Sequence, residues 1–362
     1  MKIQSIAKLA YSFNPIIKLL PKSMQVKLYS YARLKFMDKF VTNTSVSFVP
    51  DSKWQRTLWG LKFQSPLMNS AGMFKNGDGY DLAVSQGAGG YIGGTSTYNP
   101  RVGNTKHDIK LPFITLPNSH ISINTLGLPN LGDEILSKKI ITNAKTAPIG
   151  WSLMRTPDYE EHIGMENLIK SLWMYHDNPQ IDFIEINESC PNISVNSENI
   201  TNRLVYIAEH FLSKRNRHLP VVVKLSTDIG SEVLKQILNI LFQKRYDGVN
   251  LGNTSTNYSL MRQYISPGEL GLYDYYTKNF SGGVGGISLR DNSLILCDEA
   301  IKYREFIKPD YEFHVLRSGG IFGLDDIKAS IEIGVSMNQW YTGYFTNYLQ
   351  KGDEVYKSVF SS

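Results

Sequence analysis

Short apolar segments alternate with longer amphipathic segments along most of this chain, from about residue 55 onward. Continuous apolar runs of a few residues, bounded by glycine, proline or polar residues, are typical of buried parallel strands. We predict strands at residues 90–92, 147–151, 181–186, 221–225, 248–251, 313–316 and 338–341. Between them we predict helices at residues 80–86, 165–175, 202–212, 231–243, 293–306 and 324–333. This alternation predicts an α/β protein with a parallel sheet.

The strands number close to eight, and nearly all of them end in a polar residue or a glycine. This count favours a closed (β/α)8 TIM barrel over an open, doubly wound sheet. In such a barrel the carboxyl ends of the strands converge on one mouth, where catalysis occurs. The residues expected at this mouth are Gly94, Thr95, Ser152, Asn187, Lys224, Asn253, Thr254, Ser318, Gly319, Gly320, Tyr341 and Thr342.

The first 41 residues are predicted to form a separate helical segment ahead of a barrel domain at residues 42–362. Apolar residues follow helical spacing as far as Asn14 and Pro15, and a second helical stretch is expected from Ser23 to Phe36. Residues 1–40 hold eight basic residues and one acidic residue, a net charge of +7, so the rest of the chain carries −2 of the overall +5. Lysines interrupt both runs, so neither reaches the ~18 apolar residues of a membrane span.

Cationic amphipathic helices of this kind can lie in the interface of a bilayer. We therefore expect residues 1–41 to associate with a membrane surface. The alternatives are a helical hairpin packed on the main domain and a cleaved mitochondrial transit peptide, although a transit peptide would be richer in arginine.

Composition excludes several classes of protein. The two cysteines, Cys190 and Cys297, provide no disulfide framework, and the cysteines and seven histidines show no metal-ligand spacing. The negative charge of the body argues against a nucleic-acid surface. No Walker-type loop or dinucleotide fingerprint is present, which gives no support to an ATPase or a nicotinamide-binding domain.

The segment at residues 185–192, Glu-Ile-Asn-Glu-Ser-Cys-Pro-Asn, is the most informative part of the chain. It ends an apolar strand with two amides, Asn187 and Asn192, which can bind a small polar ligand. Cys190 lies between them, and Pro191 fixes the backbone beyond the thiol. An ordinary turn with a buried cysteine is the alternative.

Small residues and lysines suggest where a flat anionic ligand could bind. The sequence Ser70-Ala71-Gly72 would let a ring approach the backbone, and Lys75 could meet an anion. The glycine clusters at residues 281–286 and 317–320, the second before the helix predicted from Leu324, suit a phosphate. Lys224 ends a strand and is expected to point into the mouth, unless its amine reaches solvent instead.

Taken as an ordered set, the motifs between about residue 58 and residue 348 resemble those of the dihydroorotate dehydrogenases. These are flavoprotein barrels of pyrimidine synthesis. The resemblance implies FMN as cofactor, dihydroorotate as substrate and Cys190 as catalytic base. It further implies substrate contacts from Lys75, Asn124, Leu126, Gly127, Leu128, Asn187, Asn192, Asn253 and Thr254. It implies cofactor contacts from Ala71, Gly72, Gly94, Thr95, Asn124, Asn187, Lys224, Gly252, Gly283, Gly319, Gly320, Tyr341 and Thr342.

Within that family, the N-terminal extension and Lys75 look like the membrane-associated class, which reduces a quinone. The resemblance then implies a peripheral protein on the cytoplasmic face of a bacterial inner membrane, with the mitochondrial inner membrane as the alternative. A cysteine as catalytic base, as at Cys190, is instead typical of the soluble class, whereas the membrane class generally uses serine. Ser152 stands where the membrane class has an asparagine. The sequence after Asn192 lacks the residues of the family's active-site lid, and the quinone-tunnel arginine expected near Lys110 is absent.

The sequence is compatible with three other functions. The same flavin chemistry could use a soluble acceptor such as fumarate. Another FMN barrel enzyme, such as a reductase of uridine in RNA, would need a basic surface that the body lacks. A membrane-bound barrel that binds flavin without turnover is the third.

Overall fold

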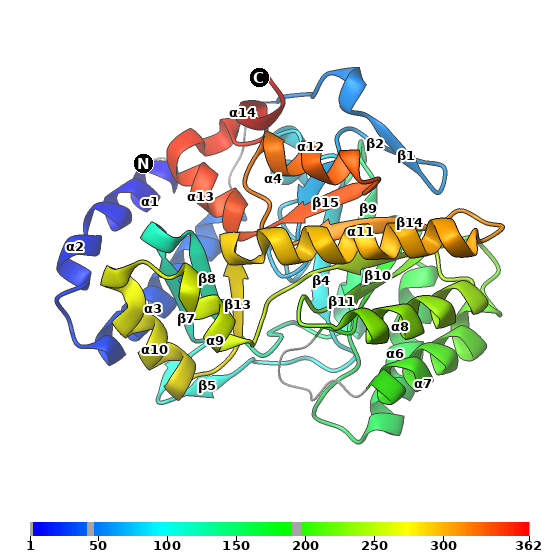
Figure 1. Cartoon of the computed structure of the whole chain (residues 1–362), viewed down its shortest axis with the longest axis horizontal. Helices are drawn as coiled ribbons and strands as arrows, with labels where there is room; N and C mark the ends of the chain where they lie inside the picture. Colours follow the sequence, from blue (N-terminus) through cyan, green and yellow to red (C-terminus); the bar gives the residue numbers. More distant parts are fainter. Residues whose placement is uncertain (1–2, 42–46, 190–196, 362) are drawn as a thin grey trace.

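The computed structural model describes residues 3–41, 47–189 and 197–361. At its centre, eight parallel strands are hydrogen-bonded in the order β3-β15-β14-β12-β11-β10-β9-β4 (Figure 1). They are β3 (Leu67–Asn69), β4 (Tyr91–Ser96), β9 (Ile149–Leu153), β10 (Phe183–Asn187), β11 (Val221–Leu225), β12 (Gly248–Leu251), β14 (His314–Ser318) and β15 (Met337–Trp340). The predicted (β/α)8 barrel is confirmed.

The side chain of Asn69 joins the first and last strands of this order. Its Nδ2 donates to the carbonyl of Ile92 at 2.7 Å, and its Oδ1 accepts from the backbone N–H of Ile92. The backbone N–H of Gly72 donates to the carbonyl of Gly94 at 2.7 Å. These bonds draw β3 and β4 together and bring the loop after β3 to the mouth of the barrel.

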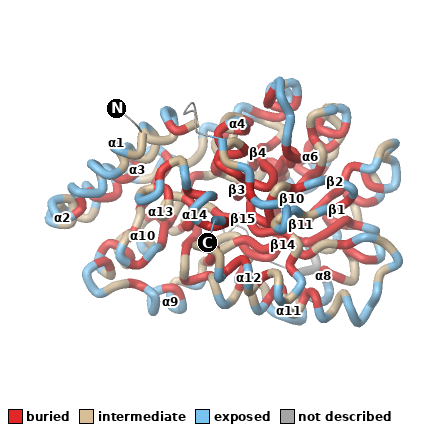
Figure 2. The backbone as a smooth tube through the Cα atoms, turned by 90° about the horizontal axis from the view of Figure 1, so that it is seen from above, coloured by how far each residue is buried: buried red, intermediate tan, exposed pale blue. Residues whose placement is uncertain are grey.

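Helices cover the outside of the barrel, and the strands form the buried centre (Figure 2). Strand β11 is buried along its whole length, which explains why its sequence is continuously apolar. Helix α8 buries only one face, through Leu234, Ile237, Leu238 and Leu241. The covering helices are α4 (Tyr80–Ser85), α5 (Asp133–Leu136), α6 (Glu161–His176), α7 (Ser197–Ile207), α8 (Ser231–Gln243), α11 (Arg290–Ile307), α12 (Leu324–Glu332), α13 (Thr342–Lys351) and α14 (Lys357–Phe360).

A three-stranded antiparallel sheet, which the sequence did not predict, lies beside the barrel. Its order is β13 (Gly283–Gly286), β8 (Ile121–Asn124) and β7 (Phe113–Leu116). Helix α10 (Leu270–Asn279) and the short α9 (Tyr258–Met261) lie next to it (Figure 1). The remaining elements are β1 (Arg56–Leu58), β2 (Leu61–Phe63), β5 (Thr105–Lys106), β6 (Ile109–Lys110) and short helical turns at Ser52–Trp54, Pro117–Ser119, Ala208–Leu212, Arg262–Tyr264, Pro267–Glu269, Ile287–Leu289 and Gly352–Glu354.

The N-terminal segment forms α1 (Ile3–Ser12), α2 (Asn14–Ile17) and α3 (Lys22–Phe40). Helix α3 packs on the small sheet, where Val26 is fully buried and the hydroxyl of Ser30 hydrogen-bonds both to the N–H and to the carbonyl of Phe113. The outer side of the segment exposes large apolar residues, including Ile16 and Leu19. The inner face of the segment therefore packs on the main domain, as the alternative of a docked helical hairpin predicted. The outer face presents apolar side chains to solvent.

Within the described residues, every helix is too short or too polar to cross a membrane.

Candidate active site

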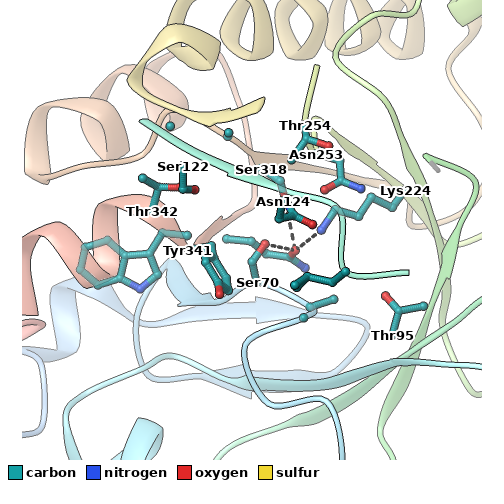
Figure 3. Close-up of a pocket in the computed structure, with 18 of the residues that line it drawn as sticks. Ser70, Thr95, Ser122, Asn124, Lys224, Asn253, Thr254, Ser318, Tyr341 and Thr342 are labelled. Carbon is teal, nitrogen blue, oxygen red and sulfur yellow. Dashed lines mark hydrogen bonds between the residues drawn. The ribbon is translucent and has the colours of Figure 1, made fainter. Parts of the chain in front are cut away.

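A cavity opens at the carboxyl ends of the barrel strands, between the barrel and the small antiparallel sheet (Figure 3). The empty space at this site is about 1260 Å³, and part of that space is open solvent in front of the cavity. Its wall combines strand-end residues with residues of β7, β8 and β13. The residues are Ser70, Ala71, Gly72, Lys75, Thr95, Phe113, Ser122, Asn124, Thr125, Leu126, Gly127, Leu128, Met154, Asn187, Lys224, Asn253, Thr254, Gly285, Gly286, Ser318, Gly319, Gly320, Ile321, Phe322, Gln339, Trp340, Tyr341, Thr342 and Gly343.

Most of the residues predicted for the site are brought together in this wall. Of those assigned to a flavin, Gly94, Gly252 and Gly283 do not line the cavity. The carbonyl of Gly94 holds the loop after β3, Gly252 lies against the carbonyl of Ser318, and Gly283 lies against the side chain of Thr254. Their close contacts are with the protein itself. Cys190 and Asn192 lie outside the described residues.

A chain of hydrogen bonds connects the amides at one side of the cavity. Asn253 donates from Nδ2 to Oγ of Ser189 at 2.6 Å, and the Ser189 hydroxyl donates to Oδ1 of Asn187 at 2.5 Å. Asn187 donates from Nδ2 to Oγ1 of Thr95 at 3.2 Å, and Thr95 lies 2.9 Å from Oγ of Ser152. These contacts fix the orientation of two amides that face the cavity. Ser189 was not singled out in the sequence, although its place between Asn187 and Cys190 was a signal.

Lys224 enters the cavity wall near the end of β11 (Figure 3), where it is hydrogen-bonded to Gln339 of the same wall and faces Glu185 behind the wall. Its Nζ donates to Oε1 of Gln339 at 2.9 Å and lies 3.6 Å from Oε1 of Glu185. Burial lowers the pKa of Lys224, and the Glu185 carboxylate opposes that shift. Neither Glu185 nor Gln339 was predicted as a site residue.

Lys75 is the second lysine of the cavity wall. Burial lowers its pKa to about 7, and the positive charge of Arg33 contributes in the same direction. Arg33 comes from α3 and donates to the hydroxyl of Tyr341 at 3.3 Å, while its guanidinium lies 5.3 Å from the ring centre of Phe113. The N-terminal segment thus contributes to the electrostatics of the site, which the sequence did not indicate.

The opposite side of the cavity has the features of a phosphate site. Backbone of Gly285, Gly286, Gly319 and Gly320 lies next to the first residues of α13, where Oγ1 of Thr342 is 2.8 Å from Oγ of Ser122. Helix α12 was expected to supply this site, but Asp326 of its own first turn accepts the N–H groups of Phe322 and Gly323. Among the described residues, the helix whose first residues line the cavity is therefore α13 and not α12.

These residues fit a flat cofactor that carries a phosphate. Gly72 has a φ of +94°, and a Cβ built on it would meet no atom within 4 Å, so its backbone is open to a ring. Lys224 stands at the inner wall, and the glycines and Thr342 could hold the phosphate. The arrangement suits a reaction in which a ring-shaped cofactor and a small polar anion bind side by side.

No described residues form a cluster that could hold a metal ion. Cys297 of α11 is fully buried between this helix and β14, and burial raises the pKa of its thiol to about 12. This thiol is therefore a packing residue and not a nucleophile.

Comparison with known proteins decides the family. The profile described as dihydroorotate dehydrogenase matches residues 54–358. The chain belongs to the dihydroorotate dehydrogenase family. A dihydroorotate dehydrogenase (quinone) from Coxiella burnetii is 26% identical over 313 residues, which cover 83% of this chain and 82% of the relative. A protein of the same name from Rippkaea orientalis is 27% identical, covering 82% of this chain and 76% of the relative.

Solved structures of dihydroorotate dehydrogenases share the fold. The enzyme of Eimeria tenella in complex with ferulenol superposes with a TM-score of 0.73 at 18% identity, covering 91% of this chain and 89% of the other. Its ligand-free form gives a TM-score of 0.74 at 18% identity, with 92% of each chain covered. Membership of this family implies a flavin cofactor, which agrees with the geometry of the cavity.

Proposed function

We propose that this protein oxidises dihydroorotate to orotate, with FMN bound in the cavity and a quinone as the final electron acceptor. The observation that carries the proposal is the cavity, where oriented amides, two lysines and a glycine-lined phosphate site face one space. The dihydroorotate dehydrogenase profile supports the reaction, and the printed names of the relatives support the quinone.

Bound in this cavity, FMN would supply a two-electron acceptor for the hydride at C6 of dihydroorotate, and a base of the protein would remove the proton at C5. We assign the base to Cys190, which lies outside the described residues. A free thiol has a pKa of about 8.5, so this base works better as pH rises unless the site lowers that pKa.

The other residues of the cavity bind and orient. In this proposal Lys75 pairs with the substrate carboxylate, while Asn124, Asn187, Asn192 and Asn253 hold the polar edge of the ring. Fixing the substrate against the cofactor in this way provides the positioning part of catalysis. Ser189 orients Asn187 and Asn253 before the substrate arrives.

We further propose that α1 to α3 attach the protein to a membrane surface as a peripheral protein. Leu19 is 84% exposed and Ile16 is 59% exposed, on a segment with a net charge of +7. Apolar side chains combined with lysines suit an interface of anionic lipids. Vesicle flotation of Leu19→Ser/Ile16→Ser should show less bound protein than Val102→Ser, which removes an exposed apolar residue elsewhere. Equal binding of the two variants would contradict the membrane role.

Anaerobic mixing of the yellow protein with dihydroorotate tests the reaction. We expect the flavin to bleach, and to recover its colour with a quinone but not with fumarate. Cys190→Ala should keep the bound flavin and nearly abolish bleaching, while Cys190→Ser tests whether an alcohol can replace the thiol. Flavin-loaded protein that dihydroorotate cannot bleach would refute the proposed function.

A further inference from the structure

The interior of the barrel at the floor of the cavity and just below it is polar, although a barrel core is ordinarily filled with branched apolar residues. Four strands each contribute one polar side chain here, and every one of them is almost completely buried. They are Glu185 from β10, Asn250 from β12, Ser318 from β14 and Gln339 from β15. The set lies against Lys224 of β11.

Glu185 is the centre of this group. Its Oε2 accepts from Nδ2 of Asn250 at 2.7 Å and from Nε2 of Gln339 at 2.8 Å. Its Oε1 faces Nζ of Lys224 at 3.6 Å and has no hydrogen-bond partner among the described residues. A buried carboxylate is costly unless a cation compensates it, and Lys224 is the cation beside it.

Lys224 and Glu185 lie at different depths relative to the cavity. Lys224 lines it, whereas Glu185 is 1% exposed and lies behind the wall. Gln339 connects them, because its amide nitrogen donates to Glu185 and its carbonyl oxygen accepts from Lys224. A ligand in the cavity therefore meets the lysine first, with a compensating negative charge directly behind it.

We propose that Glu185 is a positioning residue that offsets the charge of Lys224 at the cofactor site and thereby lowers the reduction potential of the bound flavin. This inference rests on the proposed function only in that a flavin occupies the cavity. Reduction adds negative charge to the flavin ring, and a nearby cation makes that addition easier. A carboxylate 3.6 Å from that cation weakens the effect, most strongly where water is excluded.

The consequence for the reaction concerns the second half of the cycle. A lower potential makes the flavin a weaker acceptor of the substrate hydride and a stronger donor to the next acceptor. Glu185 would thus favour reoxidation of the cofactor, and the polar barrel interior would serve the balance between the two half-reactions.

The test is the midpoint potential of the flavin in Glu185→Gln, measured by anaerobic titration with dithionite against a reference dye. Glutamine keeps the size of the side chain and removes its charge, so we expect a shift to a more positive potential. Because burial lowers the pKa of Lys224, the titration is made at about pH 6, where its amine more readily keeps the proton. Glu185→Leu removes the same charge without a polar group and should shift the potential in the same direction.

Two further variants separate charge from packing. Asp133→Asn is the matched control, because Asp133 is a fully buried carboxylate that is hydrogen-bonded to Ser171 and Tyr175 outside the cavity wall. The flavin of this variant should have the midpoint potential of the wild type. Glu185→Gln combined with Lys224→Met removes both charges and should return the potential toward the wild-type value. An unchanged potential in both single Glu185 variants would overturn the inference.

The two hypotheses fail separately in this design. Dithionite, and not dihydroorotate, reduces the flavin, so the shift in potential is read whether or not dihydroorotate is a substrate. Protein that dihydroorotate does not bleach, but whose potential rises in Glu185→Gln, would refute the proposed function and support the role of Glu185.

Discussion

The side-chain amide of Asn253 donates a 2.6 Å hydrogen bond to the hydroxyl of Ser189, and this contact ties the loop after β12 to the end of β10. The same hydroxyl donates to Asn187, so one serine sets the orientation of two amides that face the cavity. A ligand that binds both amides finds them already arranged, which reduces the entropy lost on binding.

Replacing Ser189 with alanine tests this arrangement. The variant loses two hydrogen bonds worth ~0.5–1.5 kcal/mol each, so we expect kcat/KM for dihydroorotate to fall by roughly tenfold or more. Ser171→Ala removes a buried serine that bonds to Asp133 away from the cavity wall, and it should leave kcat/KM unchanged. A Ser189→Ala enzyme with wild-type kcat/KM would show that the amides are oriented by other contacts.

The pKa of Lys75, about 7, predicts how anion binding depends on pH. A ligand carboxylate favours the protonated amine, so above pH 7 binding requires uptake of a proton. The affinity for orotate should therefore fall as pH rises, by about tenfold per pH unit well above pH 7. Titration calorimetry from pH 6 to 8.5 measures it. Lys75→Arg stays charged and should show a flat profile, and a flat profile in the wild type would contradict the prediction.

Arg33 should set the position of that pH profile. Its charge is the second cause of the low pKa of Lys75, so Arg33→Gln should raise this pKa and move the loss of orotate affinity to higher pH. The control is Lys35→Gln, which removes an exposed basic residue of the same helix. Identical profiles for the Arg33 and Lys35 variants would mean that α3 does not influence the site.

Substitution of Gly252 tests whether this glycine is needed for packing or for contact with the cofactor. A Cβ there would lie 1.8 Å from the carbonyl oxygen of Ser318, and the φ of +110° disfavours any side chain. Gly252→Ala should destabilise the protein by at least ~1–3 kcal/mol, read as a lower Tm. Gly230→Ala, where a Cβ meets nothing within 4 Å, should leave the Tm nearly unchanged. A Gly252→Ala protein with normal Tm and weakened FMN binding would instead support a cofactor contact.

The barrel was predictable because its elements carry strong local patterns. Strand β11 and helix α8 have the bounds expected from sequence, since one is buried on both faces and the other on one face at regular spacing. The small antiparallel sheet was missed for two reasons. Strand β13 has glycine at three of its four positions, so it shows no side-chain pattern, and it pairs with β8 across about 160 residues of sequence.

The site was predictable where residues follow barrel strands, because the topology alone brings those ends together. Arg33 could not be found in this way, since its contact with Tyr341 joins residues 308 positions apart and depends on how α3 docks. Glu185 did leave a signal, a carboxylate inside an otherwise apolar strand, and its role depends on partners from three other strands.

The docking of α3 has a practical consequence for any shortened form of this protein. A version that starts after Phe40 would lose the guanidinium of Arg33 beside Tyr341. It would also expose the apolar residues against which Val26 and Phe40 pack. Such a truncation, if made to test the proposed membrane attachment, would also change the electrostatics of the site through the loss of Arg33. Substitutions on the outer face of the helices are the cleaner way to separate attachment from turnover.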